Sequence, residues 1–590
     1  MEAKDTQKKA ILISADAPTE EQKQRFLTFL KQRYGNNVVL EWRQDLSVTK
    51  GFMLEVGTDL YDWSREGRVE QFERYLSGRQ KKAAMRQDGI SLLKSTLSDW
   101  ELSAHPEEIG EVLTVGDGIA TVYGLENATY GEILLFENGV RGRVEDLKED
   151  HIGCILFDNE GSVSAGSRVY RSGRTASIPV GENYIGRVIG PLGDPIDGLG
   201  EIIPERHYLI ESPAPAIIDR QPVNKPLETG ILAIDSMFPI GRGQRELLIG
   251  DRQTGKTAIA IDTIINQKGK DVLCIYVSIG QKSSSVAKIV EELRNAGAMD
   301  YTIVVHASAS DSASLQYTAP YAGCAMGEYF MNRGRDVLIV YDDLSKHAVA
   351  YRSLSLLLGR SPGREAYPGD VFYLHSRLLE RSAHLSEEKR GGSMTALPIV
   401  ETQAGDVSAY IPTNIISITD GQIFLESELF FAGQRPAINV GLSVSRVGGD
   451  AQTKAMKKAT GTLRLDLAQF REMEVFTQFA SDLDDSTKRQ LRYGESLMHI
   501  LRQRQYLSYS QADQIFLLVG ALSHAFEDVP MENLPEVLKR YLAEAKVRLS
   551  AVYRHLGERN TLEAEDRTQI ESFSHEFVKQ EPLAAPHTTE

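Results

Sequence analysis

The stretch from Glu246 to Asn266 constrains the fold of this chain more than any other part of the sequence. Its residues Gly250–Thr257 have the sequence GDRQTGKT, which matches the G-x-x-x-x-G-K-T spacing of a phosphate-binding loop. An apolar run, Leu247–Ile249, precedes the loop, and isoleucines at helical spacing follow it. The first N–H groups of such a helix have no partner within the helix, and the helix dipole favours an anion there. The pattern predicts a nucleotide site, and an ordinary glycine turn between a strand and a helix is the alternative.

Composition restricts the kinds of partner that this chain can have. With 590 residues the chain should form about three or four domains. Its net charge of −16 argues against nucleic acid as the main partner, because phosphate backbones bind basic surfaces. The cysteines Cys154, Cys274 and Cys324 have no metal-ligand spacing and predict reduced core residues in a cytosolic compartment. We expect no signal peptide and no membrane-spanning segment, so that any membrane contact goes through partner proteins.

The alternation of strand and helix patterns predicts a multidomain α/β fold. Asp117-Gly118 and Asn138-Gly139 predict tight hairpins of a small barrel. Beyond them, strands are expected at Val272–Ile279, Val337–Tyr341 and Ile415–Ile418, within a doubly wound domain. The expected order is a small α/β module (1–78), a linker helix (79–104), a β-barrel (105–176), a RecA-like phosphate-loop domain (177–455), a helical domain (456–575) and a disordered tail (576–590).

Two strand ends carry the residues that decide the chemistry. Asp342 follows the apolar strand Val337–Tyr341, where a carboxylate can hold Mg²⁺ together with the Thr257 hydroxyl, or can simply cap a loop. Gln281 follows the strand Val272–Ile279, and its amide cannot accept a proton. General-base assistance is worth ~10²–10⁴-fold in rate. The sequence therefore predicts a site that binds nucleotide and turns it over poorly, although some GTPases use a glutamine to position water.

Long motifs resemble the α subunit of F-type ATP synthases over roughly residues 105 to 570. The β subunit and the flagellar or secretion ATPases are similar in plan but carry a glutamate in place of Gln281. The motifs that carry the resemblance are GDRQTGKT (Gly250–Thr257), YVSIGQK (Tyr276–Lys282) and the segments Val340–Ala383, Glu401–Glu426 and Arg435–Gly448.

The resemblance implies a non-catalytic Mg-ATP site in this chain, with Asp342 and Thr257 at the Mg²⁺ and Arg435, Gln503 and Gln505 near the adenine. It further implies that Arg446 acts as an arginine finger in the catalytic site of a neighbouring β subunit, at an interface that Ser417 also lines. A surface ion pair is the alternative for Arg446. The nucleotide-binding residues implied in this way are Gly250, Asp251, Arg252, Gln253, Thr254, Gly255, Lys256, Thr257, Ala258, Gln281, Arg435, Gln503 and Gln505.

The first module resembles the C-terminal domain of the ATP synthase δ subunit. The segments Ser14–Gly35 and Lys50–Ser64 carry this resemblance. Lys50-Gly51 stands where the family usually has Gly-Gly, and Asp62-Trp63-Ser64 stands where it has Asp-Gly-Ser. The helical N-terminal domain of that family has no counterpart here. The resemblance implies a contact with the peripheral stalk.

Together these observations predict a regulatory, non-catalytic α subunit of a proton- or sodium-driven ATP synthase. Its expected partners are the β and γ subunits of an α3β3 ring and the b and delta-type subunits of the peripheral stalk, at the cytoplasmic face of the plasma (inner) membrane. Two alternatives are a self-sufficient hexameric motor, such as a secretion ATPase or RNA translocase, and a scaffold with an empty site. The motor would need a glutamate at position 281, and the intact Lys256-Thr257 argues against the scaffold.

Overall fold

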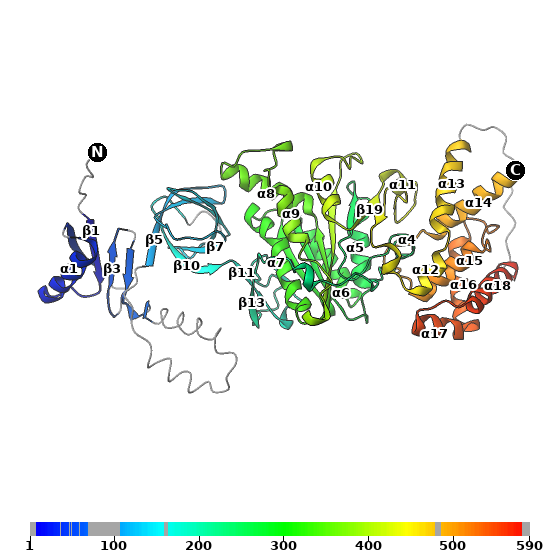
Figure 1. Ribbon diagram of the computed structural model, residues 1–590, viewed down its shortest axis with the longest axis horizontal. Coiled ribbons are helices and arrows are strands. Elements are labelled where there is room, and N and C mark those ends of the chain that lie inside the picture. The colour runs from blue at the N-terminus through cyan, green and yellow to red at the C-terminus, as the bar shows by residue number, and fades with distance from the viewer. Residues whose placement is uncertain are drawn as a thin grey trace, which may run out of the picture. The chain divides into compact units, whose positions relative to one another are not determined.

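The computed structural model divides into two compact units, Met1–Ala176 and Ser177–Glu590 (Figure 1). The expected linker helix over 79–104 and a second helix expected in the first module, with Val69, Phe72 and Leu76 on one face, lie outside the described residues. The structure describes residues 8–35, 37–45, 48, 50–57, 59–65, 67–68, 107–157, 163–477 and 485–580.

The first unit begins with an α/β module in which one helix packs on a mixed sheet. A capping box starts the helix, because the Thr19 hydroxyl accepts from the Gln22 backbone N–H while the Gln22 side chain accepts from the Thr19 N–H. Gly35, with φ +91°, ends it. The sequence did not predict the last strand of this module. Its elements are β1 (Lys8–Ser14), α1 (Glu20–Tyr34), β2 (Val38–Gln44), β3 (Met53–Val56) and β4 (Asp59–Asp62).

Six strands then form the expected barrel. They lie in the order β10-β7-β8-β9-β6-β5, and a pairing of β10 with β5 closes the barrel. The β5–β6 hairpin turns at Asp117 and Gly118, both with positive φ, as Asp-Gly turns do. The strands are β5 (Glu107–Gly116), β6 (Ile119–Tyr123), β7 (Glu132–Phe136), β8 (Arg141–Leu147), β9 (Ile152–Leu156) and β10 (Arg168–Thr175).

The second unit contains an eight-stranded sheet in the order β12-β16-β15-β17-β18-β14-β19-β20, parallel except for β20. Because parallel strands end at the same edge, the ends of β14, β15, β17 and β18 meet there. The strands of the sheet are β12 (Val188–Ile189), β14 (Leu247–Gly250), β15 (Val272–Gln281), β16 (Thr302–Ser308), β17 (Asp336–Asp342), β18 (Ser393–Glu401), β19 (Gly421–Leu425) and β20 (Val444–Ser445). A separate two-stranded sheet pairs β11 (Ser177–Val180) with β13 (Arg206–Leu209). The helices of this region are α4 (Leu232–Met237), α5 (Lys256–Ile265), α6 (Ser283–Asn295), α7 (Ala313–Met331), α8 (Leu344–Leu357), α9 (Val371–Leu379), α10 (Tyr410–Ile418) and α11 (Ser427–Phe431).

One predicted strand was wrong. Ile415–Ile418 forms the last turn of the helix α10, and the strand follows it as β19. The helix buries Ile411, Ile415 and Ile418 and leaves Ser417 exposed, which is helical spacing. The short run of β-branched residues suggested a strand. The segment is helical because a helix buries these isoleucines together on one side.

Helices make up the rest of the second unit, and their apolar faces join the same core as the sheet. The predicted disordered tail over 576–590 begins too early, because α18 continues to Gln580 and buries Phe577 and Val578. No helix in the described ranges combines the length and apolar character needed to cross a membrane. The helices are α12 (Lys454–Thr460), α13 (Leu463–Thr477), α14 (Asp485–Ile500), α15 (Gln511–Leu522), α16 (Leu534–Arg548), α17 (Ser550–Arg559) and α18 (Ala564–Gln580).

Candidate nucleotide-binding site

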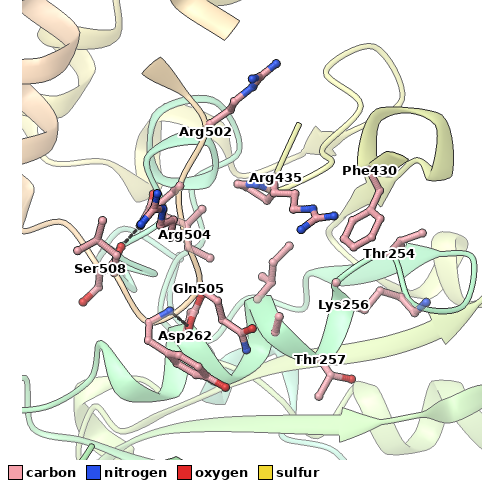
Figure 2. A pocket seen from close by; sticks show the side chains of 18 of the residues that line it. Thr254, Lys256, Thr257, Asp262, Phe430, Arg435, Arg502, Arg504, Gln505 and Ser508 are labelled. Carbon is pink, nitrogen blue, oxygen red and sulfur yellow. Dashed lines mark hydrogen bonds between the residues drawn. The ribbon is translucent and has the colours of Figure 1, made fainter. Parts of the chain in front are cut away.

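A cavity of about 2040 Å³ opens at the strand ends of the parallel sheet. The phosphate loop forms one wall, and the segment 499–509 of the helical region forms another (Figure 2). One side of α16 extends the cavity. Small-molecule pockets usually have volumes of ~300–1,000 Å³, so a nucleotide fits here with room to spare. Of the predicted site residues, those that line the cavity are Arg252, Gln253, Thr254, Gly255, Lys256, Thr257, Ala258, Gln281, Asp342, Arg435, Gln503 and Gln505.

The loop itself has the tight curvature that its glycines predicted. A Cβ on Gly250 would lie 2.3 Å from the carbonyl oxygen of Leu425, so only glycine fits there. Gly255 has φ +99° and is the N-cap residue of α5. The Lys256 ammonium is buried and donates to the Gly250 carbonyl at 2.8 Å and also to the Asp251 carbonyl. Burial lowers the pKa of Lys256. The ammonium therefore lies in the concave side of the loop, where phosphate oxygens would gather.

The side chain of Asp251 does not line the cavity and is hydrogen-bonded to neighbouring segments of the domain. Its carboxylate accepts from the Thr402 hydroxyl at 2.6 Å, from the Gly405 N–H at 2.9 Å and from the Ser427 hydroxyl at 3.1 Å. These bonds fasten the loop to the segments that follow β18 and β19. Asp251 therefore supports the phosphate site through the shape of the loop.

The two predicted metal ligands lie next to each other. The Thr257 hydroxyl donates to Asp342 Oδ2 at 2.7 Å, and the buried Tyr276 hydroxyl donates to the same oxygen at 2.7 Å. A hydroxyl and a carboxylate beside a phosphate loop are the oxygen donors that Mg²⁺ prefers, so these residues fit a Mg²⁺ bound with a nucleotide. The neighbouring Asp343 caps α8 through the Lys346 N–H at 2.8 Å, and burial raises the pKa of Asp343 to about 6.

The end of β15 carries an amide that is already engaged. Gln281 Nε2 donates to the Asp342 carbonyl at 3.3 Å, which holds the side chain across the ends of β15 and β17. Glu401, at the end of β18 and also in the cavity lining, accepts from Arg252 Nε at 3.0 Å. The end of β15 therefore presents an amide to the cavity, where an acid would be needed to take a proton.

The far end of the cavity is formed by Arg435, Phe430 and the segment 502–509. The Arg435 guanidinium lies 4.4 Å from the centre of the Phe430 ring. Gln503 lines the cavity, but its amide donates to the Gly230 carbonyl at 2.7 Å and accepts from the Leu232 N–H at 2.9 Å. In this structure Gln503 anchors the segment to the start of α4. Sequence reasoning missed Phe430 and also Asp262, which lies one helical turn beyond Ala258.

Arg446 and Ser417 lie together, but outside this cavity. Arg446 directly follows β20, is exposed, and donates from Nη2 to the Ile416 carbonyl at 3.4 Å. Ser417, also exposed, donates to the Asn414 carbonyl at 2.7 Å. The predicted site residues therefore fall into two groups, those around the cavity and the exposed pair Arg446 and Ser417.

Comparison with known proteins agrees with this division into parts. The family described as ATP synthase alpha/beta family, nucleotide-binding domain, matches residues 230–445. The beta-barrel domain of that family matches 107–173, and the C terminal domain matches 452–577. The ATP synthase subunit alpha of Acetivibrio thermocellus is 57% identical over 491 residues, which cover 83% of this chain and 97% of that protein. This chain belongs to the ATP synthase alpha subunit family. The subunit alpha of Caldanaerobacter subterraneus subsp. tengcongensis is 62% identical over 458 residues, covering 77% of this chain and 90% of that protein.

The family described as ATP synthase delta (OSCP) subunit matches residues 1–76. The chain is therefore an F-type ATP synthase alpha subunit with a delta domain fused before it, as the two resemblances predicted. Alpha subunits are typically the non-catalytic members of the complex, which favours this interpretation over a self-sufficient motor.

Proposed function

We propose that this alpha subunit binds Mg-ATP in its own cavity as a lasting ligand and contributes Arg446 to catalysis in a neighbouring β subunit. The proposal that Mg-ATP is a lasting ligand rests on Gln281, an amide at the end of β15 beside an intact phosphate loop. The site can attract and orient a triphosphate, but it offers no acid at that strand end to take a proton from water.

The contacts suggest how the nucleotide would lie. The triphosphate would follow the loop N–H groups and the Lys256 ammonium. Thr257 and Asp342 would hold Mg²⁺, which supplies positive charge against the phosphates when bound. The base would reach the far end between Arg435 and the segment 503–505.

The exposed site at Arg446 suits a role outside this chain. Within the described ranges its guanidinium makes one long hydrogen bond, 3.4 Å to the Ile416 carbonyl, so it can turn towards a partner at little cost. A planar guanidinium can bridge two oxygens of a γ-phosphate and offset the charge that develops there. Ser417 lies beside it on the same surface and would share that interface.

The fused module would connect the ring to the peripheral stalk. In an α3β3 ring around a γ subunit, each copy of this chain would carry a delta-like module near the b subunits of the stalk, in the place of a full-length delta subunit. The complex would work at the cytoplasmic face of the plasma (inner) membrane, driven by protons or sodium ions, with membrane contact through its other subunits alone. A ring has three alpha positions but one delta position, so three fused chains would bring more delta-like modules than the complex can place. The numbers agree if some alpha positions hold an unfused chain.

Native mass measurement of the complex purified through this chain tests the proposal. We expect β and γ chains to copurify, with one to three copies of this chain per ring and no full-length delta subunit. A separate full-length delta at one per ring would contradict the stalk role of the module. A preparation that contains this chain as a homohexamer without β would contradict the alpha-subunit role itself.

A further inference from the structure

The turn between α10 and β19 holds the backbone of Arg446. The Arg446 N–H donates to the carbonyl of Asp420, which lies in this turn, at 2.9 Å. The Arg446 guanidinium donates to the Ile416 carbonyl, in the last turn of α10, at 3.4 Å. Of these two bonds the backbone bond is the shorter and better placed to fix the chain. The position of Arg446 therefore depends on where Asp420 lies.

Arg245 holds Asp420 through both its backbone and its side chain. The Asp420 N–H donates to the Arg245 carbonyl at 2.9 Å, and the Arg245 N–H donates to Asp420 Oδ2 at 3.0 Å. The guanidinium adds a fork, from Nε to Oδ2 at 2.9 Å and from Nη2 to Oδ1 at 2.8 Å. Two parallel bonds from a planar guanidinium to a carboxylate fix orientation as well as distance.

The Arg245 guanidinium is itself held from the other side. Its Nη1 donates to the carboxylate of Glu380, the residue that ends α9. The same carboxylate pairs with Arg220 Nη2 at 3.1 Å, and Arg220 Nη2 also donates to the Glu380 carbonyl at 2.9 Å. The Arg245 side chain is 13% exposed, so water competes little for these bonds. A guanidinium fixed at both sides leaves Asp420 little freedom to move.

The residue before each of the two arginines adds a second tie. Gln244 is fully buried, and its Nε2 donates to the Ser445 hydroxyl oxygen at 3.3 Å. The Ser445 hydroxyl in turn donates to the Pro239 carbonyl at 2.9 Å. The chain then runs from Arg245 through Glu246 into β14, whose other end is the phosphate loop. The segment that precedes the phosphate-loop strand thus supports the end of β20 from which Arg446 projects.

We propose that Arg245 is a positioning residue for Arg446, and that its fork to Asp420 sets the place from which the Arg446 guanidinium reaches the neighbouring β subunit. The inference rests on the role of Arg446 proposed above. Among the described residues the Arg446 guanidinium makes one long hydrogen bond, so its own contacts hold it weakly. Its starting point comes from the backbone bond to Asp420. A displacement of about 1 Å at a group that acts on the reacting atoms can lower a rate about 100-fold.

The test combines Arg245→Lys with Arg446→Ala in the complex reconstituted from the full-length chain with β and γ subunits. Lysine keeps the positive charge but cannot form the fork to two oxygens. We expect Arg245→Lys alone to lower kcat for ATP hydrolysis about 10- to 100-fold, with KM for ATP within about threefold of the wild type. In the Arg446→Ala background the same substitution should lower the residual rate by less than about twofold, because the group that it positions is absent. Phosphate release from radiolabelled ATP measures the residual rate.

Two further variants make the result specific. Arg187→Lys is the matched control, because Arg187 forms the same fork, from Nε to Asp197 Oδ2 at 2.7 Å and from Nη2 to Oδ1 at 2.8 Å, with its side chain 14% exposed. It precedes β12, at the sheet edge opposite to β20, and should keep kcat within about twofold of the wild type. Asp420→Asn keeps the carbonyl that binds the Arg446 N–H but cannot accept the whole fork, so it should resemble Arg245→Lys.

The possible failures point to different errors. A wild-type kcat in Arg245→Lys, in a complex where Arg446→Ala collapses turnover, overturns the inference. An equal fold-loss with and without Arg446, or an equal loss in Arg187→Lys, also overturns it, since either result indicates general destabilisation. If neither Arg245→Lys nor Asp420→Asn enters the complex, the fork serves folding and the inference is wrong. Normal turnover in Arg446→Ala would instead overturn the proposed role of Arg446, and this inference with it.

Discussion

Replacing Arg446 by alanine is expected to reduce steady ATP hydrolysis by the assembled complex by about 10³-fold or more. The side chain is exposed and makes one long hydrogen bond among the residues that the structure describes, so its loss should cost this subunit little stability. A large effect would therefore arise at the neighbouring subunit, where we propose that the guanidinium stabilises charge on the γ-phosphate as it develops. Hydrolysis by the reconstituted ring and ATP binding by this chain are measured on the same preparation, and ATP binding should be unchanged.

Two further variants sharpen this prediction. Arg446→Lys keeps the charge but loses the planar fork, so it should restore only part of the activity. Arg489→Ala is the matched control, because the Arg489 side chain is also exposed and has one comparable bond, 3.4 Å to the Asp485 carbonyl. It should leave turnover within about twofold of the wild type. Normal turnover in Arg446→Ala would leave Arg446 as an ordinary surface residue.

Replacing Lys256 by alanine is expected to weaken nucleotide binding to this chain by about 100-fold. The ammonium is buried in the loop and donates to the carbonyls of Gly250 and Asp251, so its removal takes away both the phosphate partner and a bond that shapes the loop. The affinity for Mg-ATP is measured on the purified subunit. In the assembled ring the effect on turnover should be much smaller than that of Arg446→Ala, because we propose that this cavity holds its ligand without cleaving it.

Lys539→Ala provides the comparison for Lys256→Ala. Lys539 is also a lysine of the cavity wall, but it belongs to α16, away from the phosphate loop. Its removal lowers the local charge equally and should change affinity by no more than about threefold. Equal losses in the two variants would indicate a general electrostatic effect and would argue against a specific phosphate contact at Lys256.

The parts of the fold that could be predicted from sequence are those with a local signal. The phosphate loop, the strand ending at Asp342 and the Asp-Gly hairpin at Asp117 depend on contiguous residues, and the structure has them. Ile415–Ile418 was wrong because four residues cannot separate a strand from one side of a helix. The extension of α18 through Phe577 was also not predicted, since it depends on packing against distant helices.

The site was predictable to a similar extent. The loop and strand-end residues follow from the motif and from parallel-sheet geometry, which brings the ends of β14, β15 and β17 together. The use of Gln503 was not predictable, because its partners Gly230 and Leu232 lie far away in the sequence. The position of Asp262 in the cavity was also not predictable, because it depends on contact with Tyr506, which lies far away in the sequence.

The central claim is that the cavity binds ATP without hydrolysing it, because the end of β15 carries an amide in place of an acid. This claim is tested most directly on the isolated subunit. Purified chain is saturated with Mg-ATP, and the bound nucleotide and released phosphate are followed over time. The account predicts that ATP binds, stays largely intact and yields negligible phosphate in the absence of a β subunit. Brisk phosphate release by the chain alone, abolished by Lys256→Ala and therefore arising in this cavity, would contradict it.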